Sequence, residues 1–443
     1  MTISLIDPFT FTAHSSSRSG QSTAETLFMK RRLFLNQLAR AAAFAPLARC
    51  AWGTDTNNLP GPSVAAGFEF LHTTDWLARW QKSILKEANA RYCDTELGET
   101  VAWLTAPFLN GFYYGYCATR DVSWVARLID WADSWLKRGV KEPDGFIGWP
   151  KKGTGSAAEE AFLTDSMLGE ATCLRPVVLM ADKILKTPAL KDKFGSRAQA
   201  WLGLAEQIFE KWVARGCWRE VMDGGLWVAP EFAIDRQTGQ WTSGYARRNV
   251  DGFSNPANKE NYIALWLLAM WDATQKPIYK QHAEKWFRLM KSRMRTHGEG
   301  KYYTWNYWDP AGPWDYEPNR APRHWIGVHR NGSYQQMDLE GIVAAFEHGL
   351  VFTKEELRRL IATNRDLMWN QQFVGAKFQR VDGRLDEAGQ KSWAGCLWPA
   401  LVPYDESLRK VFVVSHDPAS WAGLDLTPWF RARLAEGFPT APL

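Results

Sequence analysis

The sequence predicts an all-α protein, an α/α toroid of six or seven helical hairpins whose long loops wall a groove or tunnel. After residue 68, helices that are apolar on one face alternate with helices that are apolar on nearly every side. A helix that is apolar all round is buried, so the alternation indicates an inner ring wrapped by an outer ring. The long connections, in addition, all precede the helices of the apolar kind.

The individual elements follow from apolar spacing. Amphipathic helices are predicted over 125–136, 278–294 and 357–368, and buried helices over 101–116, 161–180, 262–271 and 341–346. Short strands are expected at 411–414 and within parts of the long loops.

Loop lengths predict where the inner helices open. Connections after the buried helices are short, at 119–121, 272–276 and 351–353, whereas those before them are long, at 139–155, 223–255, 296–333 and 370–391. Inner helices of a toroid run in one direction, so the long loops gather at one mouth. Long loops are usually functional or disordered, and the Trp and Tyr content of these argues against disorder.

The N-terminal region predicts export. Arg31 and Arg32 precede Leu-Phe-Leu and a modest apolar run, which is typical of a twin-arginine signal, and Met29 is an alternative start. We therefore assign residues 1–53 to an export signal, 54–67 to a linker and 68–443 to one catalytic domain. The expected location is periplasmic or secreted, with no membrane contact after signal cleavage; a cytosolic basic helix is the alternative.

Composition limits the classes of ligand and cofactor that the protein is expected to bind. The formal charge is +5, and residues 1–53 contribute six basic and two acidic side chains, which leaves about +1 for the rest. This balance argues against nucleic-acid binding. The six cysteines form no CxxC and no Cys/His metal spacing, and no dinucleotide or Walker glycine motif occurs. We expect a monomer with no metal and no cofactor. The 25 tryptophans either fill a helical core or stack on sugar rings.

Three polar clusters fall at the predicted mouth. In "NPANKENY" (255–262), Asn258, Glu260 and Asn261 open an otherwise apolar helix, which helix capping alone does not explain. We expect Asn258 and Asn261, which share a face, to contact a ligand.

The second cluster is "GKYYTWNYWDPAGPW" (300–314), an aromatic loop punctuated by Gly and Pro. Strand-like alternation places Tyr303, Trp305 and Tyr307 on one face and Tyr302 and Asn306 on the other. We expect these residues to line the groove; packing beneath the loop is the alternative for the tyrosines.

The third cluster is "RHWIGVHRNGSYQQMDLEG" (323–341), which supplies Arg323, His329, Arg330 and Tyr334. Residues 320–334 hold three Arg and two His and no acid, which favours an anionic ligand. A solvated basic loop is the alternative. From the other long loops we add Arg248 and Trp149 as substrate-binding candidates.

A basic, tyrosine-rich, Trp-walled groove suits β-elimination of a uronic-acid polysaccharide. The carboxylate of the uronate is neutralised, a base removes the C5 proton and an acid protonates the leaving O4. Cationic neighbours that lower its pKa would let Tyr303 or Tyr307 act as base and acid, with His329 as a rival base. Asn258, Glu260 and Arg330 are the candidate neutralisers.

On these three motifs the chain resembles the α/α-toroid lyases of glucuronan and alginate, most closely polysaccharide lyase family 38. The resemblance implies a site of Glu260, His329, Arg330 and a tyrosine within 302–307, acting on an anionic polysaccharide. Many toroid alginate lyases carry an Asn-His pair on an inner helix, where this chain has Glu260 and Asn261.

The sequence leaves two alternatives open. A six-hairpin glycoside hydrolase of the unsaturated glucuronyl hydrolase type would need two carboxyl groups, and the candidates are Glu159, Asp165, Glu170, Glu260 and Asp338. A non-catalytic periplasmic glycan-binding protein would keep the Trp walls and need no acid or base.

Overall fold

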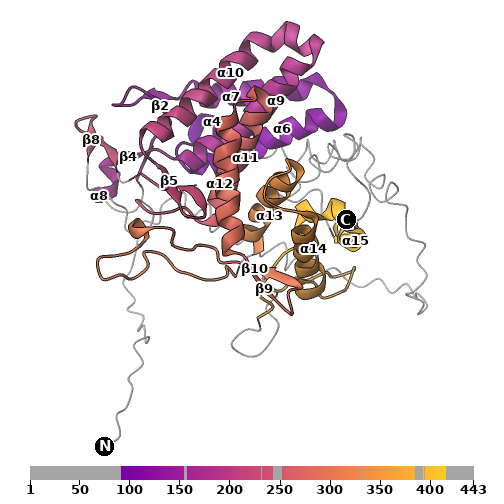
Figure 1. Ribbon diagram of the computed structural model, residues 1–443. Helices are drawn as coiled ribbons and strands as arrows, with labels where there is room; N and C mark the ends of the chain where they lie inside the picture. The colour runs from indigo at the N-terminus through magenta and orange to yellow at the C-terminus, as the bar shows by residue number, and fades with distance from the viewer. Residues whose placement is uncertain are drawn as a thin grey trace, which may run out of the picture. The chain divides into compact units, whose positions relative to one another are not determined.

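The computed structural model of the protein describes residues 91–153, 157–230, 232–242, 252–330, 332–384, 393 and 395–415 (Figure 1). The predicted export signal, the linker and Arg248 lie outside these ranges.

The described part is helix-rich, and its most buried helices form one series of neighbours. Helix α9 (Met167–Lys186) contacts α5 (Thr100–Leu104), α6 (Ala106–Thr119) and α11 (Ala257–Thr274), and α11 in turn contacts α13 (Gly332–Glu347). Residues 263–270 of α11 are all buried, as expected for a helix that is apolar on every side. The burial of α11 is what the sequence predicts for a helix of the all-apolar kind, whereas α5 and α13 are only partly buried.

Three amphipathic helices each follow an inner helix and pack against it: α7 (Val122–Leu136), α10 (Pro188–Ala214) and α12 (Pro277–Arg293). Their apolar faces are buried, as at Trp124, Leu128 and Trp135 of α7. The turns from α6 to α7 and from α11 to α12 are short because Arg120 and Gln275 adopt a left-handed conformation that ends the inner helix at once. The resulting hairpins are compatible with a helical toroid.

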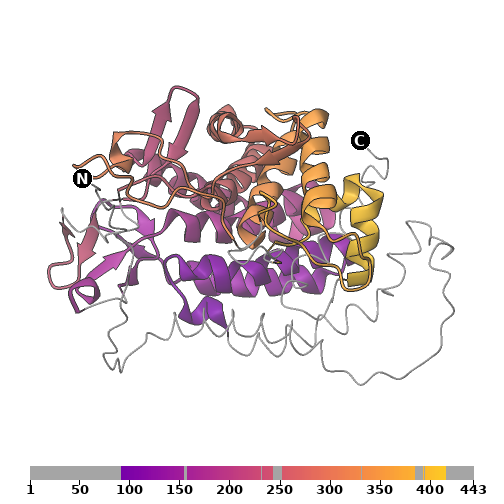
Figure 2. The same ribbon diagram turned by 90° about the horizontal axis from the view of Figure 1, so that it is seen from below.

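The C-terminal part of the described chain is more irregular. Helix α14 (Lys354–Ala362) continues into a π-helical turn, η2 (Thr363–Met368). The 3-10 segment η3 (Pro399–Tyr404) contacts α13, α14 and α15 (Glu406–Ser415), and these three helices lie close together in both views (Figures 1 and 2). Residues 411–414 are thus helical, and the predicted strand is wrong: Leu408, Val411 and Phe412 recur at helical spacing and are buried.

The long loops contain short antiparallel strands. β1 (Val140–Lys141) pairs with β2 (Ile147–Gly148), β5 (Trp218–Val221) with β6 (Gly224–Trp227), and β9 (Arg295–His297) with β10 (Tyr302–Thr304). A four-stranded sheet has the order β3 (Lys151–Lys152), β4 (Phe162–Thr164), β7 (Ala233–Asp235) and β8 (Trp241–Thr242). Residues 162–164, predicted as helix, pair instead with β3 and β7. The part of the chain that the structure describes also contains the short helices α4 (Tyr92–Thr95), α8 (Ala157–Glu160) and η1 (Pro313–Asp315).

The 305–330 segment crosses the end of the helices where α11 begins and α12 ends, drawn in orange in Figure 1. The Ala257 N–H at the start of α11 donates to the Tyr307 carbonyl at 3.0 Å. The long loop therefore lies at the start of α11, and it leads directly into α13.

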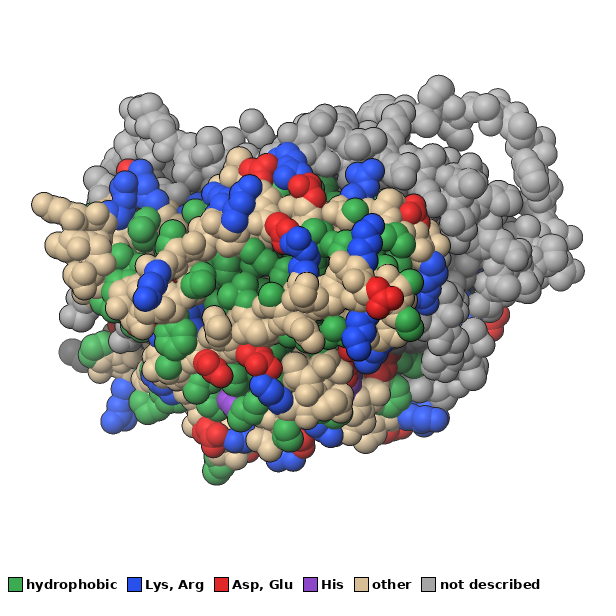
Figure 3. Space-filling view, turned by 90° about the horizontal axis from the view of Figure 1, so that it is seen from above, with side chains coloured by type: hydrophobic (Ala, Val, Ile, Leu, Met, Phe, Trp, Pro, Cys, Tyr) green, Lys and Arg blue, Asp and Glu red, His purple; other side chains and the backbone are tan. Residues whose placement is uncertain are grey.

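Charges of both signs are interspersed on the face drawn in Figure 3, without a large area of one sign. Within the ranges described above, no helix is both long enough and apolar enough to cross a membrane.

Candidate functional site

Two tyrosines and two histidines converge where the inner helices begin, and we call Tyr307, His324, His329 and Tyr334 the His/Tyr cluster. The ring centroids of His329 and Tyr334 are 4.1 Å apart, and the Tyr307 ring lies 5.0 Å from His329 and 5.2 Å from Tyr334. The ring centroid of His324 lies 5.8 Å from that of Tyr307. The second and third sequence clusters therefore meet in space, as predicted.

The backbone that carries Tyr307 is held on both sides. Its N–H donates to the Gly327 carbonyl at 2.8 Å, and its carbonyl accepts from the N-terminus of α11. The loop beyond it is tied down by the buried Asp315 carboxylate, which accepts from the Ser254 N–H, the Ser254 hydroxyl and the Ala311 N–H. A fixed loop of this kind can hold side chains in a defined geometry for chemistry.

The environment of Tyr307 keeps its hydroxyl protonated. Burial raises the pKa of Tyr307 well above its usual value, and the charges of Tyr334, Glu99 and Asp338 act in the same direction. The expectation that cationic neighbours lower the pKa of this phenol is therefore wrong. A phenol that keeps its proton is suited to donate it, so the geometry favours Tyr307 as an acid rather than a base.

His324 is held as a neutral imidazole with a defined tautomer. Burial lowers its pKa, and Lys259 adds to the effect. The Trp325 N–H donates to His324 Nδ1 at 2.6 Å, so Nε2 carries the hydrogen in the neutral ring. His324 can thus offer a donor at Nε2, and its ring is stacked on Trp308 with centroids 5.6 Å apart.

Cationic and aromatic side chains surround the cluster. Lys259 forms an ion pair with Glu99 at 2.8 Å. Arg330 is exposed directly after His329. Trp325 is 52% exposed, with its ring 6.3 Å from that of His329. Lys259 and Trp325 were not among the site residues predicted from the sequence. A lysine at the start of an apolar helix and a tryptophan in the basic stripe could have indicated them, whereas nothing in the sequence pattern indicated Glu99.

Tyr303, the first choice for the acid/base, lies elsewhere. It is 7% exposed, its hydroxyl accepts from Arg359 Nη1 at 3.2 Å, and its backbone N–H donates to Thr363. Tyr302 packs against His297 and Lys301. Strand β10 ends at Thr304, so the alternation does not extend to Tyr307. The prediction that Tyr303, Trp305 and Tyr307 share one face is wrong.

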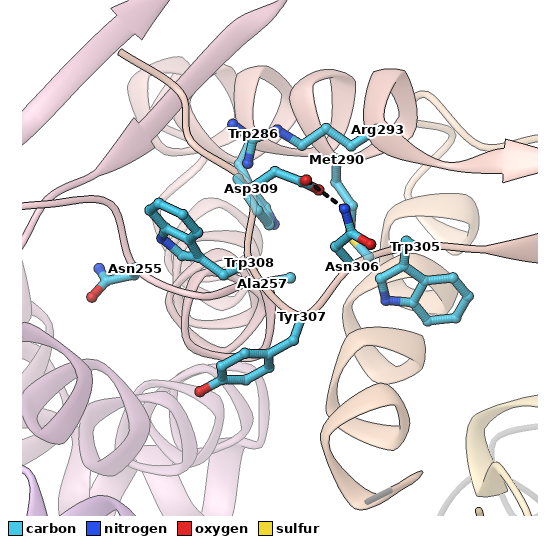
Figure 4. Close-up of a pocket in the computed structure, with 10 residues that line it drawn as sticks. All are labelled: Asn255, Ala257, Trp286, Met290, Arg293, Trp305, Asn306, Tyr307, Trp308 and Asp309. Atoms are coloured by element: carbon cyan, nitrogen blue, oxygen red, sulfur yellow. Dashed lines mark hydrogen bonds between the residues drawn. The ribbon is translucent and has the colours of Figure 1, made fainter. Parts of the chain in front are cut away.

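The side chains after β10 point in different directions (Figure 4). Asn306 donates to Asp309 and accepts from Arg295, and both Asn306 and Asp309 point away from Tyr307 into a pocket beneath the loop. That pocket is lined by Asn255, Ala257, Trp286, Met290, Arg293, Trp305, Asn306, Tyr307, Trp308 and Asp309. Trp305 is buried, and its Nε1 donates to Asp338 at 2.8 Å. Trp305 and Asn306 therefore hold the loop, and the expectation that Trp305 stacks on substrate is wrong.

The residues of the first cluster face the protein interior. Glu260 is buried and accepts from the Trp227 N–H and from Asn255, and burial raises its pKa to about 8. Asn261 is fully buried, donates to Asp338 and accepts from Trp286 Nε1. The expectation that Glu260 and Asn261 contact a ligand is wrong, because both pack helix α11 onto its neighbours. Asn258 is also buried, contacts Met337, and its Oδ1 has no hydrogen-bond partner.

Two further candidates have structural roles. Trp149 is buried against Trp135 with ring centroids 4.6 Å apart and donates to the Trp135 carbonyl, so it is not available for stacking on sugar. Arg323 donates to the Gly252 and Trp314 carbonyls, which fixes the loop. Arg248 lies outside the described residues.

The carboxyl groups that a hydrolase would need are mostly buried. Asp165 and Glu170 accept from Lys211 Nζ at 2.6 and 2.5 Å in a buried ionic cluster with Arg215 and Glu142. Like Glu260, Asp338 is buried, and its pKa is raised to about 7. Such groups stabilise the fold and cannot flank a glycosidic bond, which disfavours the two-carboxylate mechanism.

Within the part of the chain that the structure covers, no group of three or more His, Cys, Asp or Glu is placed to hold a metal ion.

Comparison with known proteins gives little further information. No protein-family model matches the chain, and no curated protein does. A solved structure described as a D-mannose isomerase is similar at 13% sequence identity and a TM-score of 0.43, over 82% of this chain and 87% of that one. A likeness this distant does not indicate an activity.

Proposed function

We propose that the protein is an exported polysaccharide lyase that cleaves a uronic-acid polysaccharide, glucuronan or alginate, by β-elimination. The observation that carries the proposal is the convergence of Tyr307, His329 and Tyr334 at one end of the inner helices, within 5.2 Å of one another by ring centroids. A base and an acid at one place are what this reaction requires.

In the proposed mechanism His329 is the base and Tyr307 the acid. His329 takes the C5 proton, the C5–H electron pair forms the C4–C5 double bond, and the C4–O4 bond breaks. Tyr307 gives its proton to the leaving O4 and recovers one from solvent, while His329 releases the C5 proton to solvent. Tyr307 suits the acid role because burial and its anionic neighbours keep it protonated. Tyr334 packs on the His329 ring and orients it.

The negative charge of the C6 carboxylate must be neutralised before the C5 proton is acidic enough for a base to remove it. Lys259 and the exposed Arg330 supply positive charge beside the cluster, and His324 offers an Nε2–H donor. Trp325 and Ile326, 52% and 42% exposed, present apolar surface on which a sugar ring can stack. In this proposal residues 68–443 close an α/α toroid around the groove, and residues 1–53 direct twin-arginine export.

One experiment tests the proposal. Mature protein is incubated with glucuronan, alginate and neutral glycans, and ultraviolet absorbance of the conjugated C4–C5 double bond is followed together with new reducing ends. We expect both signals on a uronan, and a loss of about 10²–10⁴-fold in His329→Asn. The matched control is His297→Asn, since His297 lies on β9 beside Tyr302 and away from the cluster. Reducing ends without absorbance would make the protein a hydrolase, and normal turnover by His329→Asn would remove the proposed base.

A further inference from the structure

A second polar group lies deeper among the inner helices. Arg175 on α9, Tyr262 on α11 and Glu340 on α13 are partly exposed, although the residues before and after each of them are mostly buried. Part of each of these three side chains is therefore accessible to solvent. We call Arg175, Tyr114, Tyr262 and Glu340 the inner cluster.

The inner cluster is separate from the His/Tyr cluster. Glu340 lies six residues beyond Tyr334 on α13. At about 1.5 Å per residue this is roughly 9 Å along the helix. The His/Tyr cluster, in contrast, lies at the level where α11 and α13 begin. A sugar chain would need more than one residue to reach both.

Arg175 has the surroundings of an anion-binding group. Its Nη2 donates to the Tyr114 hydroxyl at 3.3 Å, and Glu340 and Tyr262 are close enough to favour its charged form. Arg175 makes no ion pair within 4.0 Å to any described residue. A partly buried guanidinium whose fork is not engaged by a carboxylate is the geometry that a carboxylate ligand can complete with two parallel hydrogen bonds.

Asn110 adds an independent observation. Its Oδ1 is buried and has no hydrogen-bond partner. Asn110 precedes Tyr114 by four residues on α6, so both side chains lie on one face of that helix. An unsatisfied buried acceptor costs free energy unless a donor arrives. A sugar hydroxyl is such a donor. The inner cluster and Asn110 together therefore offer a guanidinium donor for an anion and an amide acceptor for a hydroxyl.

We propose that Arg175 binds the carboxylate of a uronate residue in a second subsite, with Asn110 accepting from one of its hydroxyls. The substrate class rests on the proposed function, whereas the subsite itself does not depend on elimination. A uronate held here would fix how far a chain enters between the inner helices, and hence which of its bonds lies at the His/Tyr cluster.

Binding measured without turnover tests the subsite. The dissociation constants of glucuronate and of glucose are measured by calorimetry for the full chain and for Arg175→Gln. Removal of a charge-assisted hydrogen bond of about 1.5–3 kcal/mol predicts roughly 10–100-fold weaker glucuronate binding. Arg288→Gln is the matched control, because Arg288 lies on the outer helix α12 and pairs with Glu284. Melting temperatures establish that each variant is folded.

The outcomes are separable. Glucuronate binding that depends on Arg175, in a protein that eliminates no uronan, would support the subsite and overturn the lyase. Unchanged binding by folded Arg175→Gln, or equal affinity for glucose and glucuronate, would overturn the subsite and leave the lyase standing. If Arg175→Gln does not fold, Tyr114→Phe takes its place: removal of the hydroxyl that holds the guanidinium should weaken glucuronate binding several-fold, and no change would contradict the proposal.

Discussion

Replacement of Tyr307 by Phe removes the proposed acid and little else. The Tyr307 hydroxyl makes no hydrogen bond to another described residue, while its ring packs against His329 and Tyr334. Phe keeps that packing, so the melting temperature should stay within a few degrees. Loss of a general acid costs about 10²–10⁴-fold in rate, which corresponds to about 3–5 kcal/mol of activation free energy.

Tyr303→Phe is the matched control, because Tyr303 lies four positions before Tyr307 in the sequence and in a different environment. Its hydroxyl accepts one hydrogen bond from Arg359 Nη1 at 3.2 Å. Loss of that bond should lower the free energy of unfolding by about 0.5–1.5 kcal/mol and leave the rate near wild type. The two variants thus separate a loss of rate from a loss of stability.

The assay measures the initial rate of increase in ultraviolet absorbance on the preferred uronan, at saturating and at low substrate concentrations. Urea unfolding of each variant is measured in parallel. The expected pattern is a large fall in kcat for Tyr307→Phe alone. A large fall for Tyr303→Phe with normal turnover by Tyr307→Phe would refute the assignment of Tyr307 and return the role to Tyr303.

Three further predictions concern the scaffold and the chemistry. Lys211→Met should destabilise the fold by about 3–5 kcal/mol in urea, because it leaves the buried Asp165 and Glu170 uncompensated, whereas Lys186→Met at an exposed pair should cost little; equal costs would contradict this. Burial raises the pKa of Glu260 to about 8, so its folded form keeps a proton that the unfolded chain releases near 4.5, and its contribution to stability is lost as pH rises toward 8. Glu260→Gln should therefore reduce the fall of unfolding free energy between about pH 5 and 8 by up to about 1.4 kcal/mol per pH unit, and an unchanged slope would count against the raised pKa. Chelation should leave uronan turnover unchanged, since the proposed neutralisers are Lys259, Arg330 and His324; loss that calcium or zinc restores would contradict this.

The helical hairpins were predictable because burial imposes a periodicity that the sequence displays. The apolar character of α11 and the alternating face of α7 follow from 3.6-residue spacing, and both helices form as predicted. The secondary-structure predictions are wrong where the local sequence pattern favours one structure and tertiary contacts favour another. Val411 lies in a β-branched run that favours strand, yet it is buried in helix α15 against η3.

The candidate site was predictable in place but not in side-chain direction. The sequence indicates which loops meet, and His329, Tyr334 and Tyr307 do meet. It does not indicate that Glu260 faces β6, because a polar residue at a helix start serves equally to bind a ligand or to hold a neighbouring strand. Only the packing of α11 against the loops decides between these roles.

Elimination and hydrolysis of a uronan leave different groups on the product, so the chemical structure of the product decides between them. Nuclear magnetic resonance of the oligosaccharides released from the preferred uronan shows the group at the new non-reducing end. We expect a C4–C5 unsaturated uronate with a vinylic proton at C4. A saturated uronate at that end, with oxygen from water in the product, would contradict it.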